Sequence, residues 1–420
     1  MNRFFKRLLS FSIYVKLLPF LILYLVLINL RSKSNDLIGD ESRYIQFSNN
    51  LIDGFYSPPF PDINLWNGPG YPIFITPFIA LDFSILAVRL TNGLLLYFSL
   101  IFIYKTIKVY TTKRTALISA FVIGLYFPAY QMLYYILTEA LSWFLVSLIC
   151  FSLAILHKSK IISLKYLLLS SFSIAYLALV KVIFGYVIAI VTLTATLLYL
   201  IPKLRAHLYK SILTFYLSLL FCFPYLIYTY NLTGKFFYWT NSGGMSLYTM
   251  STPYPDEFGD WSNTTVLESN PRHRDFIQSL STLTPIERDE AFKRKAIENI
   301  ILNPKKYAAN CFANIGRMLL DFPYTKSKHH VNSLFYFFPS MFMIVFISVS
   351  IFFGILYYKL VPFELYILLF FFLTYLLGST FVSAYSRMFN ITLPFWTLFI
   401  FYIFSYLFSI GKKQIKQGNH

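Results

Sequence analysis

Long apolar runs recur along this 420-residue chain, from about position 17 to position 410. A helix needs roughly 20 mostly apolar residues to cross about 30 Å of hydrocarbon, so runs of this length predict membrane spans. The composition agrees, because 57% of the residues are hydrophobic and only 13% are charged, which is too little polar surface for soluble domains. We therefore predict an all-α polytopic membrane protein and exclude a secreted or cytosolic globular enzyme.

About ten segments have the length and apolarity of transmembrane helices. The first, which follows three basic residues and lacks a small-residue cleavage site, is expected to be a retained signal anchor. The predicted organisation is an N-terminal transmembrane module over 1–230, a loop domain over 231–332 and C-terminal helices with a tail over 333–420. The predicted spans are 11–30, 84–104, 115–134, 136–156, 166–180, 182–201, 211–230, 333–357, 361–379 and 391–410.

The basic residues predict the orientation of these spans. The formal charge of +18 comes from 36 Lys and Arg against 18 Asp and Glu. The basic residues lie in short clusters between alternate apolar runs instead of forming one patch, which argues against nucleic acid as a partner and follows the positive-inside pattern. With a cytoplasmic N-terminus, the first loop (31–83) and the large loop (231–332) are extracytoplasmic. We expect an integral protein of a bacterial plasma membrane with its active site on that outer side.

Both of these loops contain signals for short helices. Asp40 precedes a predicted helix that runs to about Asp53 and ends at Gly54, and the apolar segment Tyr71 to Leu81 is too short to span and is expected to lie at the membrane interface. In the large loop, a capping box begins one amphipathic helix and Asn-Pro begins a second. Their apolar stripes are Phe292, Ala296 and Ile300, then Tyr307, Cys311, Ile315 and Leu319.

Ionisable residues in or beside the spans are candidate functional residues, because a charge in hydrocarbon costs several kcal/mol unless it has a partner. On the predicted topology, Glu139, Lys181 and Arg387 all come to the outer membrane surface, next to Asp40 and Glu41 of the first loop. Three separate stretches thus bring one acid and two bases to the same side. A carboxylate that accepts a proton, beside cations that hold a phosphate, fits a reaction with an anionic leaving group.

Each of these residues also has a purely structural interpretation. Asp40 can cap the helix that follows it. Glu139 and Arg387 can be interface residues whose charged ends reach water, and Arg89 can do the same or pair with Asp82. Lys181 is harder to explain in this way, because almost no loop separates the apolar segments on its two sides.

Other kinds of site have little support in the sequence. The chain contains no P-loop, no GxGxxG after a strand and no HExxH. His329 and His330 lack a third metal ligand nearby, and three cysteines are too few for a disulfide framework. We therefore expect no defined metal site and no established cofactor, although a divalent cation remains an open alternative.

Several segments resemble polytopic GT-C glycosyltransferases of the aminoarabinose-transferase and protein-mannosyltransferase type. The segment Gly39 to Tyr44 is similar to the family's D-E-x-R-Y signature, and the order and sidedness of the remaining matches also agree. These further matches are Asn67 to Pro72, which resembles G-P-G-Y-P, Leu137 to Ala140, Gly234 to Gly243, and Asn303 to Tyr307, which resembles N-P-x-x-Y.

The resemblance implies a membrane transferase that moves a sugar from a polyprenyl-phosphate carrier to a glycan, lipid or protein acceptor outside the cytoplasm, with inversion. It implies that Asp40 is the catalytic base and that Lys181 and Arg387 bind the donor phosphate. Glu41, Arg43, Tyr44 and Glu139 would orient the acceptor or the sugar.

Two other functions remain as alternatives. One is a transporter or flippase of polysaccharide intermediates, although the sequence shows no internal repeat of the kind that many transporters have. The other is a lipid-linked glycan polymerase or ligase, which shares the lipid-phosphate chemistry and differs in the acceptor.

Overall fold

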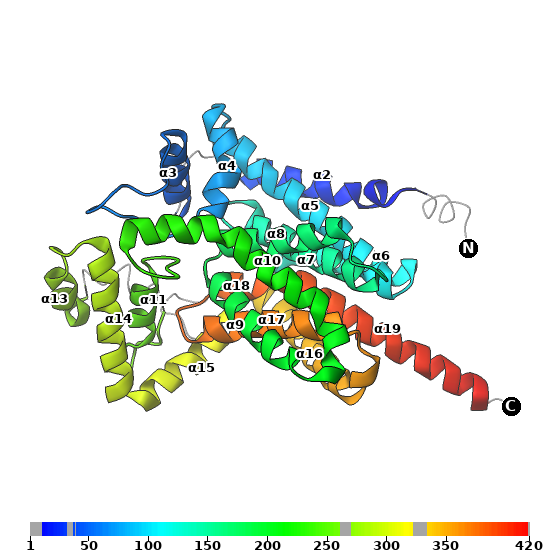
Figure 1. The fold of residues 1–420 in the computed structure, drawn as a ribbon. Coiled ribbons are helices and arrows are strands. Elements are labelled where there is room, and N and C mark those ends of the chain that lie inside the picture. Colours follow the sequence, from blue (N-terminus) through cyan, green and yellow to red (C-terminus); the bar gives the residue numbers. More distant parts are fainter. Residues whose placement is uncertain (1–10, 32–36, 38, 261–269, 322–333, 419–420) are drawn as a thin grey trace.

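The computed structural model describes residues 11–31, 37, 39–260, 270–321 and 334–418, and within these ranges the secondary structure is helical, without strands. Apolar helices form an elongated bundle (Figure 1). Both chain ends lie at the right-hand end of this view, while α3, α11, α13 and α14 lie at the opposite end. The short helices of the two predicted extracytoplasmic loops therefore lie at one end of the bundle, as the charge pattern predicts.

All ten predicted spans are helical, and they differ in length. Among the described residues, six helices have at least 18 residues and the hydropathy of a membrane span, while three shorter apolar helices and one bent pair of helices account for the other four predicted spans. The six are α2 (Ile13–Arg31), α5 (Ile85–Tyr110), α7 (Glu139–Lys158), α10 (Pro202–Thr233), α16 (Leu334–Leu356) and α17 (Phe363–Thr380). The shorter ones are α8 (Leu164–Val180), α9 (Ile183–Tyr199) and the apolar part, Leu393–Ser409, of α19 (Leu393–Gly418).

The predicted span 115–134 is bent instead of straight. It consists of α6 (Lys113–Gly124) and the 3-10 helix η1 (Phe127–Leu133), with 64° between them. In a continuous helix the carbonyl of Gly124 would accept from the backbone N–H of residue 128, but that residue is proline and has none. The hydroxyls of Tyr24 and Tyr130 donate to this carbonyl instead, each at 3.0 Å.

The first loop has the two short helices that the sequence predicts. They are α3 (Glu41–Ile52) and α4 (Gly70–Ala80), which pack against each other, and α4 also contacts α8. Gly54 follows α3 with φ of +91°, a left-handed conformation that favours glycine. The helix therefore ends where the sequence predicts.

The large loop contains α11 (Gly243–Met250), α13 (Pro271–Ser279), α14 (Pro285–Leu302) and α15 (Pro304–Leu320). The predicted capping box is present at the start of α14, and Phe292 and Ala296 belong to a small separate core. The buried face of α15 differs from the predicted stripe, because its buried residues include Asn310, Asn314 and Arg317. The predicted apolar stripe of α15 is half-buried and lies beside this polar face.

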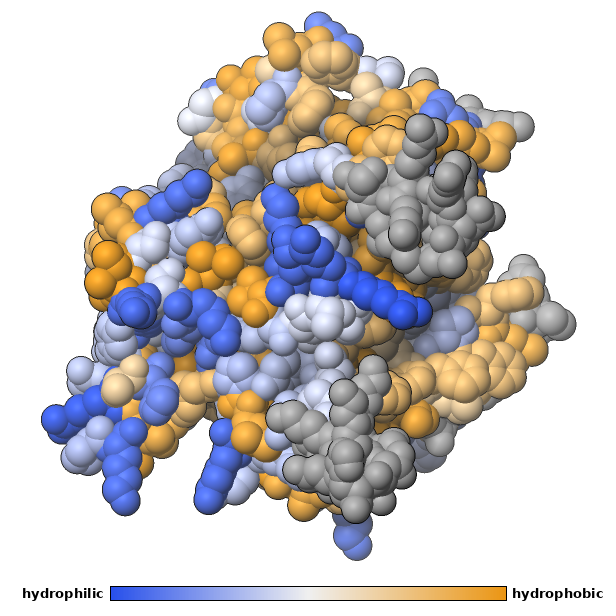
Figure 2. Space-filling model, turned by 90° about the vertical axis from the view of Figure 1, so that its right-hand side faces the viewer, coloured by the Kyte–Doolittle hydropathy of each residue, from blue (hydrophilic) through white to orange (hydrophobic). Residues whose placement is uncertain are grey.

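Figure 2 looks onto the end of the bundle that carries the two termini, and it shows hydrophilic side chains gathered among hydrophobic ones. The lysine-rich connections before α6 and between α7 and α8 lie at this end, because α5 and α7 both finish there. This arrangement agrees with the predicted separation of basic loops from the two extracytoplasmic loops. The basic residues before Phe11 and the pair His329 and His330 lie outside the described residues.

Candidate active site

Asp40 occupies the N-cap position of α3, but its carboxylate does not cap the helix. Its backbone is already helical, with φ of −73° and ψ of −13°, and its side chain makes no cap hydrogen bond. The carboxylate is instead turned toward two arginines. Its Oδ1 atom lies 3.1 Å from Nη1 of Arg43, and its Oδ2 atom lies 3.4 Å from Nη1 of Arg387. The capping interpretation of Asp40 therefore does not hold.

Arg387 connects Asp40 to a second, more deeply buried ion pair. It lies in the short helix α18 (Ser386–Asn390), and its Nε atom is 4.0 Å from Oε1 of Glu139 at the start of α7. The same oxygen accepts from Nζ of Lys181 at 2.7 Å. The five residues Asp40, Arg43, Glu139, Lys181 and Arg387, called the charge cluster below, thus place three cations around two carboxylates.

The charge cluster is graded in exposure. The side chains of Glu139 and Lys181 are 5% and 11% exposed, whereas those of Asp40 and Arg387 are 29% and 39% exposed. Buried ions are tolerated when they are paired, which explains why Lys181 can end an apolar helix. The exposed side of Asp40 and Arg387 is the part of the cluster that a substrate can reach.

Tyr44 and Asn67 support the exposed side of the cluster. Arg43 contacts Oδ1 of Asn67 at 3.4 Å and lies over the ring of Trp66, 5.2 Å from its centroid. The amide of Asn67 donates to the hydroxyl of Tyr44 at 3.1 Å. Burial raises the pKa of Tyr44, and the negative charges of Asp40 and Glu139 raise it further, so this side chain is a neutral phenol at physiological pH.

Two glycines allow the first loop to lie directly on the end of α8. A Cβ atom at Gly68 would lie 2.1 Å from the carbonyl oxygen of Leu179, and one at Gly70 would lie 2.7 Å from the backbone nitrogen of Val180. No larger residue fits at either position without moving the backbone. Because Lys181 follows α8 directly, this close approach places the first loop beside Lys181.

Glu41 is not a member of the charge cluster and makes a buried contact with Arg89 of α5. Its carboxylate is fully buried, binds Nη2 of Arg89 at 3.1 Å and accepts from the backbone N–H of Ile136 at 2.7 Å. The expectation that Arg89 reaches water or pairs with Asp82 is wrong, because Arg89 is 4% exposed and pairs with Glu41 while Asp82 is exposed. An unpaired charge away from water is costly, so the buried Arg89 pairs with a carboxylate that is buried beside it.

The comparison with solved structures identifies the fold. No protein-family model and no curated protein matches the sequence. The oligosaccharyltransferase of Archaeoglobus fulgidus in its apo form is 13% identical, with a TM-score of 0.52 over 96% of this chain and 52% of that chain. The archaeal oligosaccharyltransferase AglB from Archaeoglobus fulgidus, in complex with an inhibitory peptide and a dolichol-phosphate, is 14% identical, with a TM-score of 0.52 over 97% of this chain and 52% of that chain. This protein has a GT-C-like fold.

A second similar structure is ArnT from Cupriavidus metallidurans bound to undecaprenyl phosphate. It is 12% identical, with a TM-score of 0.40 over 93% of this chain and 78% of that chain. The chain spans about half the length of the archaeal oligosaccharyltransferase. The fold class predicted from the sequence is confirmed, with six long apolar spans among the described helices.

Within this GT-C-like fold, the structure brings together six of the seven predicted site residues. Asp40, Arg43 and Tyr44 come from the start of α3, and Glu139, Lys181 and Arg387 come from three later elements. The seventh, Glu41, is turned toward Arg89, where it fixes the start of α3 to α5. The roles predicted for all seven stay predictions.

Sequence reasoning missed a polar network that holds the segment before Arg387. Arg317 of α15 is fully buried, and its guanidinium donates to the backbone carbonyls of Ala384 at 3.1 Å, Phe258 at 3.2 Å and Gly259 at 3.0 Å. These carbonyls belong to two segments far apart in the chain. Arg317 therefore ties the large loop to the segment that carries Arg387.

Asn314 completes this network. Its Oδ1 atom accepts from the backbone N–H of Ala384 at 3.0 Å and from Nη2 of Arg317 at 2.7 Å. Its amide nitrogen lies within hydrogen-bond distance of three backbone carbonyls at the end of α17 and just beyond it, those of Ser379, Thr380 and Val382. The spacing of Asn310, Asn314 and Arg317, at i, i+4 and i+7, is a polar stripe in the sequence that could have revealed this buried face.

The described residues contain no group of three or more His, Cys, Asp or Glu side chains that could hold a metal ion. The two carboxylates of the charge cluster are paired with cations instead. A role for a divalent cation is therefore left to the assay described below.

Proposed function

We propose that this protein is a membrane glycosyltransferase that moves a sugar from a polyprenyl-phosphate-linked donor to an extracytoplasmic acceptor, with inversion. The observation that carries this proposal is the position of the Asp40 carboxylate, which lies in reach of solvent beside Arg387, with Lys181 and Glu139 behind it. A base and cations at one site are what such a transfer requires.

In the proposed reaction, Asp40 accepts the proton of the acceptor hydroxyl as the hydroxyl oxygen forms a bond to the anomeric carbon. The bond between that carbon and the phosphate oxygen of the carrier breaks on the opposite face, so the configuration inverts. The electron pair of the broken bond stays on the phosphate. Arg387, helped by Lys181, stabilises the negative charge that develops there.

The remaining site residues position these groups. Arg43 and Tyr44 are linked through Asn67 and hold the acceptor side of Asp40, while Glu139 fixes both Arg387 and Lys181. Glu41 acts through its pairing with Arg89, which fixes the start of α3. In this scheme the acceptor orientation predicted for Glu41 is indirect.

The choice of donor class is supported by the fold and by sidedness. One structure of the similar archaeal enzyme holds a dolichol-phosphate, and another is tethered to an acceptor peptide. A lipid-linked sugar can reach an extracytoplasmic site from the bilayer, whereas nucleotide sugars are cytoplasmic. We propose that α4, which packs on the end of α8, forms one wall of the lateral entrance in a bacterial plasma membrane.

The test is a transfer assay with the purified full-length protein, short-chain polyprenyl-phosphate sugars and a panel of glycan, lipid and protein acceptors, read by mass spectrometry. Running it with and without a chelator also decides whether a divalent cation takes part. We expect an acceptor product of inverted configuration together with free polyprenyl phosphate. If no donor sugar is released or transferred under any condition, the transferase proposal fails and a flippase assay in liposomes becomes the next test.

The acceptor class separates this proposal from the polymerase or ligase alternative. A polymerase would extend a lipid-linked glycan, while the proposed transferase adds a single sugar. Product masses distinguish the three, because a polymerase gives a ladder, a ligase adds the mass of a whole glycan in one step, and the proposed transferase adds the mass of one sugar.

A further inference from the structure

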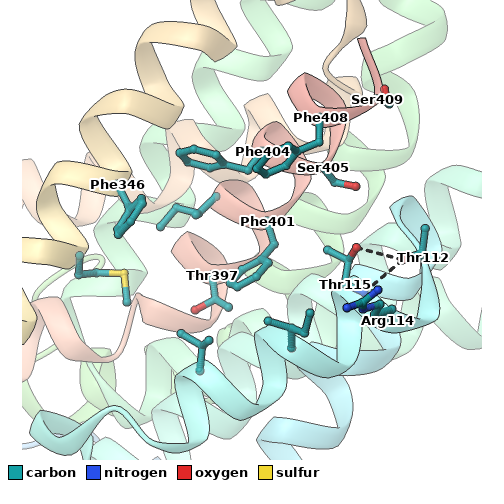
Figure 3. Close-up of a pocket in the computed structure, with 14 residues that line it drawn as sticks. Thr112, Arg114, Thr115, Phe346, Thr397, Phe401, Phe404, Ser405, Phe408 and Ser409 are labelled. Carbon is teal, nitrogen blue, oxygen red and sulfur yellow. Dashed lines mark hydrogen bonds between the residues drawn. The ribbon is translucent and has the colours of Figure 1, made fainter. Parts of the chain in front are cut away.

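A groove lies on the membrane-facing surface of the bundle, away from the charge cluster. It is formed by α6, α16 and α19, and its volume is about 1070 Å³ (Figure 3). α16 packs against α19 and η1, and α6 packs against α19. The lining residues of α6 all precede the bend after Gly124, so the groove runs beside the straight part of this helix.

The lining of the groove is apolar along most of its length. The lining residues of each helix recur at helical spacing, so each helix turns one face toward the groove along its whole length. Ile118 and Val122 on α6 are about half exposed, at 48% and 50%, as expected for side chains that contact lipid. The other apolar lining residues are Met343, Phe346, Ile400, Phe401, Phe404 and Phe408.

One end of the groove is polar and cationic. Arg114 lies there with Thr112, Thr115, Ser405 and Ser409, as Figure 3 shows. Arg114 is exposed, and in the part of the chain that the structure describes no carboxylate pairs with it. A cation at the end of an apolar membrane groove is complementary to an anionic lipid headgroup.

The length of the groove matches one leaflet. Thr397, at its deep end, and Ser409, at its polar end, are 12 residues apart on α19, which corresponds to about 18 Å at 1.5 Å per residue. The hydrocarbon of one leaflet is roughly 15 Å thick, half of the core of a bilayer. An acyl chain that starts at Arg114 would therefore end near the middle of the membrane.

The groove opens toward the leaflet opposite the charge cluster. Arg387 precedes α19 by a few residues at one end of the bundle. Ser409 lies about 24 Å from the start of α19 at 1.5 Å per residue, and Arg114 of α6 lines the same groove. A lipid whose phosphate binds Arg114 cannot present the same phosphate to Arg387. The occupant of the groove is thus distinct from the proposed donor.

We propose that the groove between α6, α16 and α19 binds a phospholipid with an anionic headgroup from the leaflet on the lysine-rich side. Arg114 binds the phosphate, Thr112 and Ser409 contact the headgroup, and one acyl chain lies along Ile118, Val122 and Phe404. The lipid fills the hollow between α6, α16 and α19, so it stabilises the packing of α16 on the bundle. The proposal does not depend on the proposed transferase activity.

Native mass spectrometry of the full-length protein in detergent tests this proposal, with phosphatidylglycerol, phosphatidylcholine and a short polyprenyl phosphate as probes. We expect phosphatidylglycerol to bind in preference to phosphatidylcholine, and Arg114→Ala to weaken phosphatidylglycerol binding about tenfold, because a charge-assisted contact is lost. The matched control is Lys160→Ala, an exposed cation at the same end of the bundle but outside the groove, which should leave binding unchanged.

A second variant tests the groove independently of the charge. Ile118→Trp places a large ring at an exposed lining position, and it should weaken phosphatidylglycerol binding while leaving the fold intact. Polyprenyl phosphate binding should be the same in Arg114→Ala and wild type. Equal binding of phosphatidylglycerol by Arg114→Ala and wild type, no preference over phosphatidylcholine, or a specific loss of polyprenyl phosphate binding in Arg114→Ala would each overturn the proposal.

Discussion

The Nη1 atom of Arg387 lies 3.4 Å from Oδ2 of Asp40, although 347 positions separate the two residues in the chain. The C-terminal helices thus complete a site that begins in the first loop. Arg387 also reaches Glu139 at the start of α7, so it joins the two carboxylates of the charge cluster. The site therefore depends on the packing of α3, α7, the end of α8 and α18, and each of its members can be tested by substitution.

The Asp40→Asn variant tests the catalytic base. An amide cannot accept the proton of the acceptor hydroxyl, so we expect transfer to fall by about 10²- to 10⁴-fold in the mass-spectrometric assay. Because the Asp40 side chain makes no cap bond, the variant should keep its thermal stability. Asp53→Asn at the exposed other end of α3 is the matched control and should keep full activity. If Asp40→Asn retains most of its activity, Asp40 is not the catalytic base.

Arg387→Ala tests stabilisation of the leaving phosphate. The loss of a charge-assisted contact of roughly 1.5–3 kcal/mol should lower turnover about ten- to a hundredfold. Arg387 is partly exposed, so the variant should insert and melt like the wild type. Unchanged turnover with every donor would show that this guanidinium does not contact the phosphate.

The buried pair of Lys181 and Glu139 needs a double substitution, because removal of one partner leaves a buried charge. Lys181→Met alone should lower the free energy of unfolding by about 3–5 kcal/mol. Lys181→Met with Glu139→Gln should recover most of this stability, which thermal melting can measure, but not the activity. If the stable double variant transfers sugar at the wild-type rate, the pair is structural.

The contact between Glu41 and Arg89 is predicted to be structural. Arg89→Met leaves the fully buried carboxylate of Glu41 without its main partner, so we expect the free energy of unfolding to fall by about 3–5 kcal/mol. Adding Glu41→Gln should restore most of the loss. Residual activity of the double variant then reports whether Glu41 also orients the acceptor, since a purely structural role predicts activity close to wild type.

The network around Arg317 is predicted to position Arg387. Arg317→Lys keeps the charge but cannot span the carbonyls of Ala384, Phe258 and Gly259 together, so the segment before α18 should shift. We expect Arg317→Lys to lower turnover, although by less than Arg387→Ala does. The effect should be seen mainly as weaker use of the donor. Arg294→Lys, on the exposed face of α14, is the matched control. A melting temperature that falls while the kinetic constants hold would restrict Arg317 to stability.

Much of the fold follows from local sequence signals. Apolar runs, the capping box at Thr284 and Gly54 after α3 each act within a few residues, so the helices and many of their ends can be predicted. The bend after Gly124 was also encoded locally, in Pro128, but the apolar run that contains it hid the signal. The sidedness of the basic loops follows from the same local arrangement of charges.

The sequence alone determined which residues are charged at the ends of apolar segments, and it therefore identified Asp40, Glu139, Lys181 and Arg387 as candidates. Only the tertiary structure decided their partners. It paired Asp40 with Arg387, gave Glu41 to Arg89 and buried Arg317 among backbone carbonyls. The physical reason is that hydrophobicity and helix capping act over one or two turns, whereas the partner of a buried charge is set by which helices pack together.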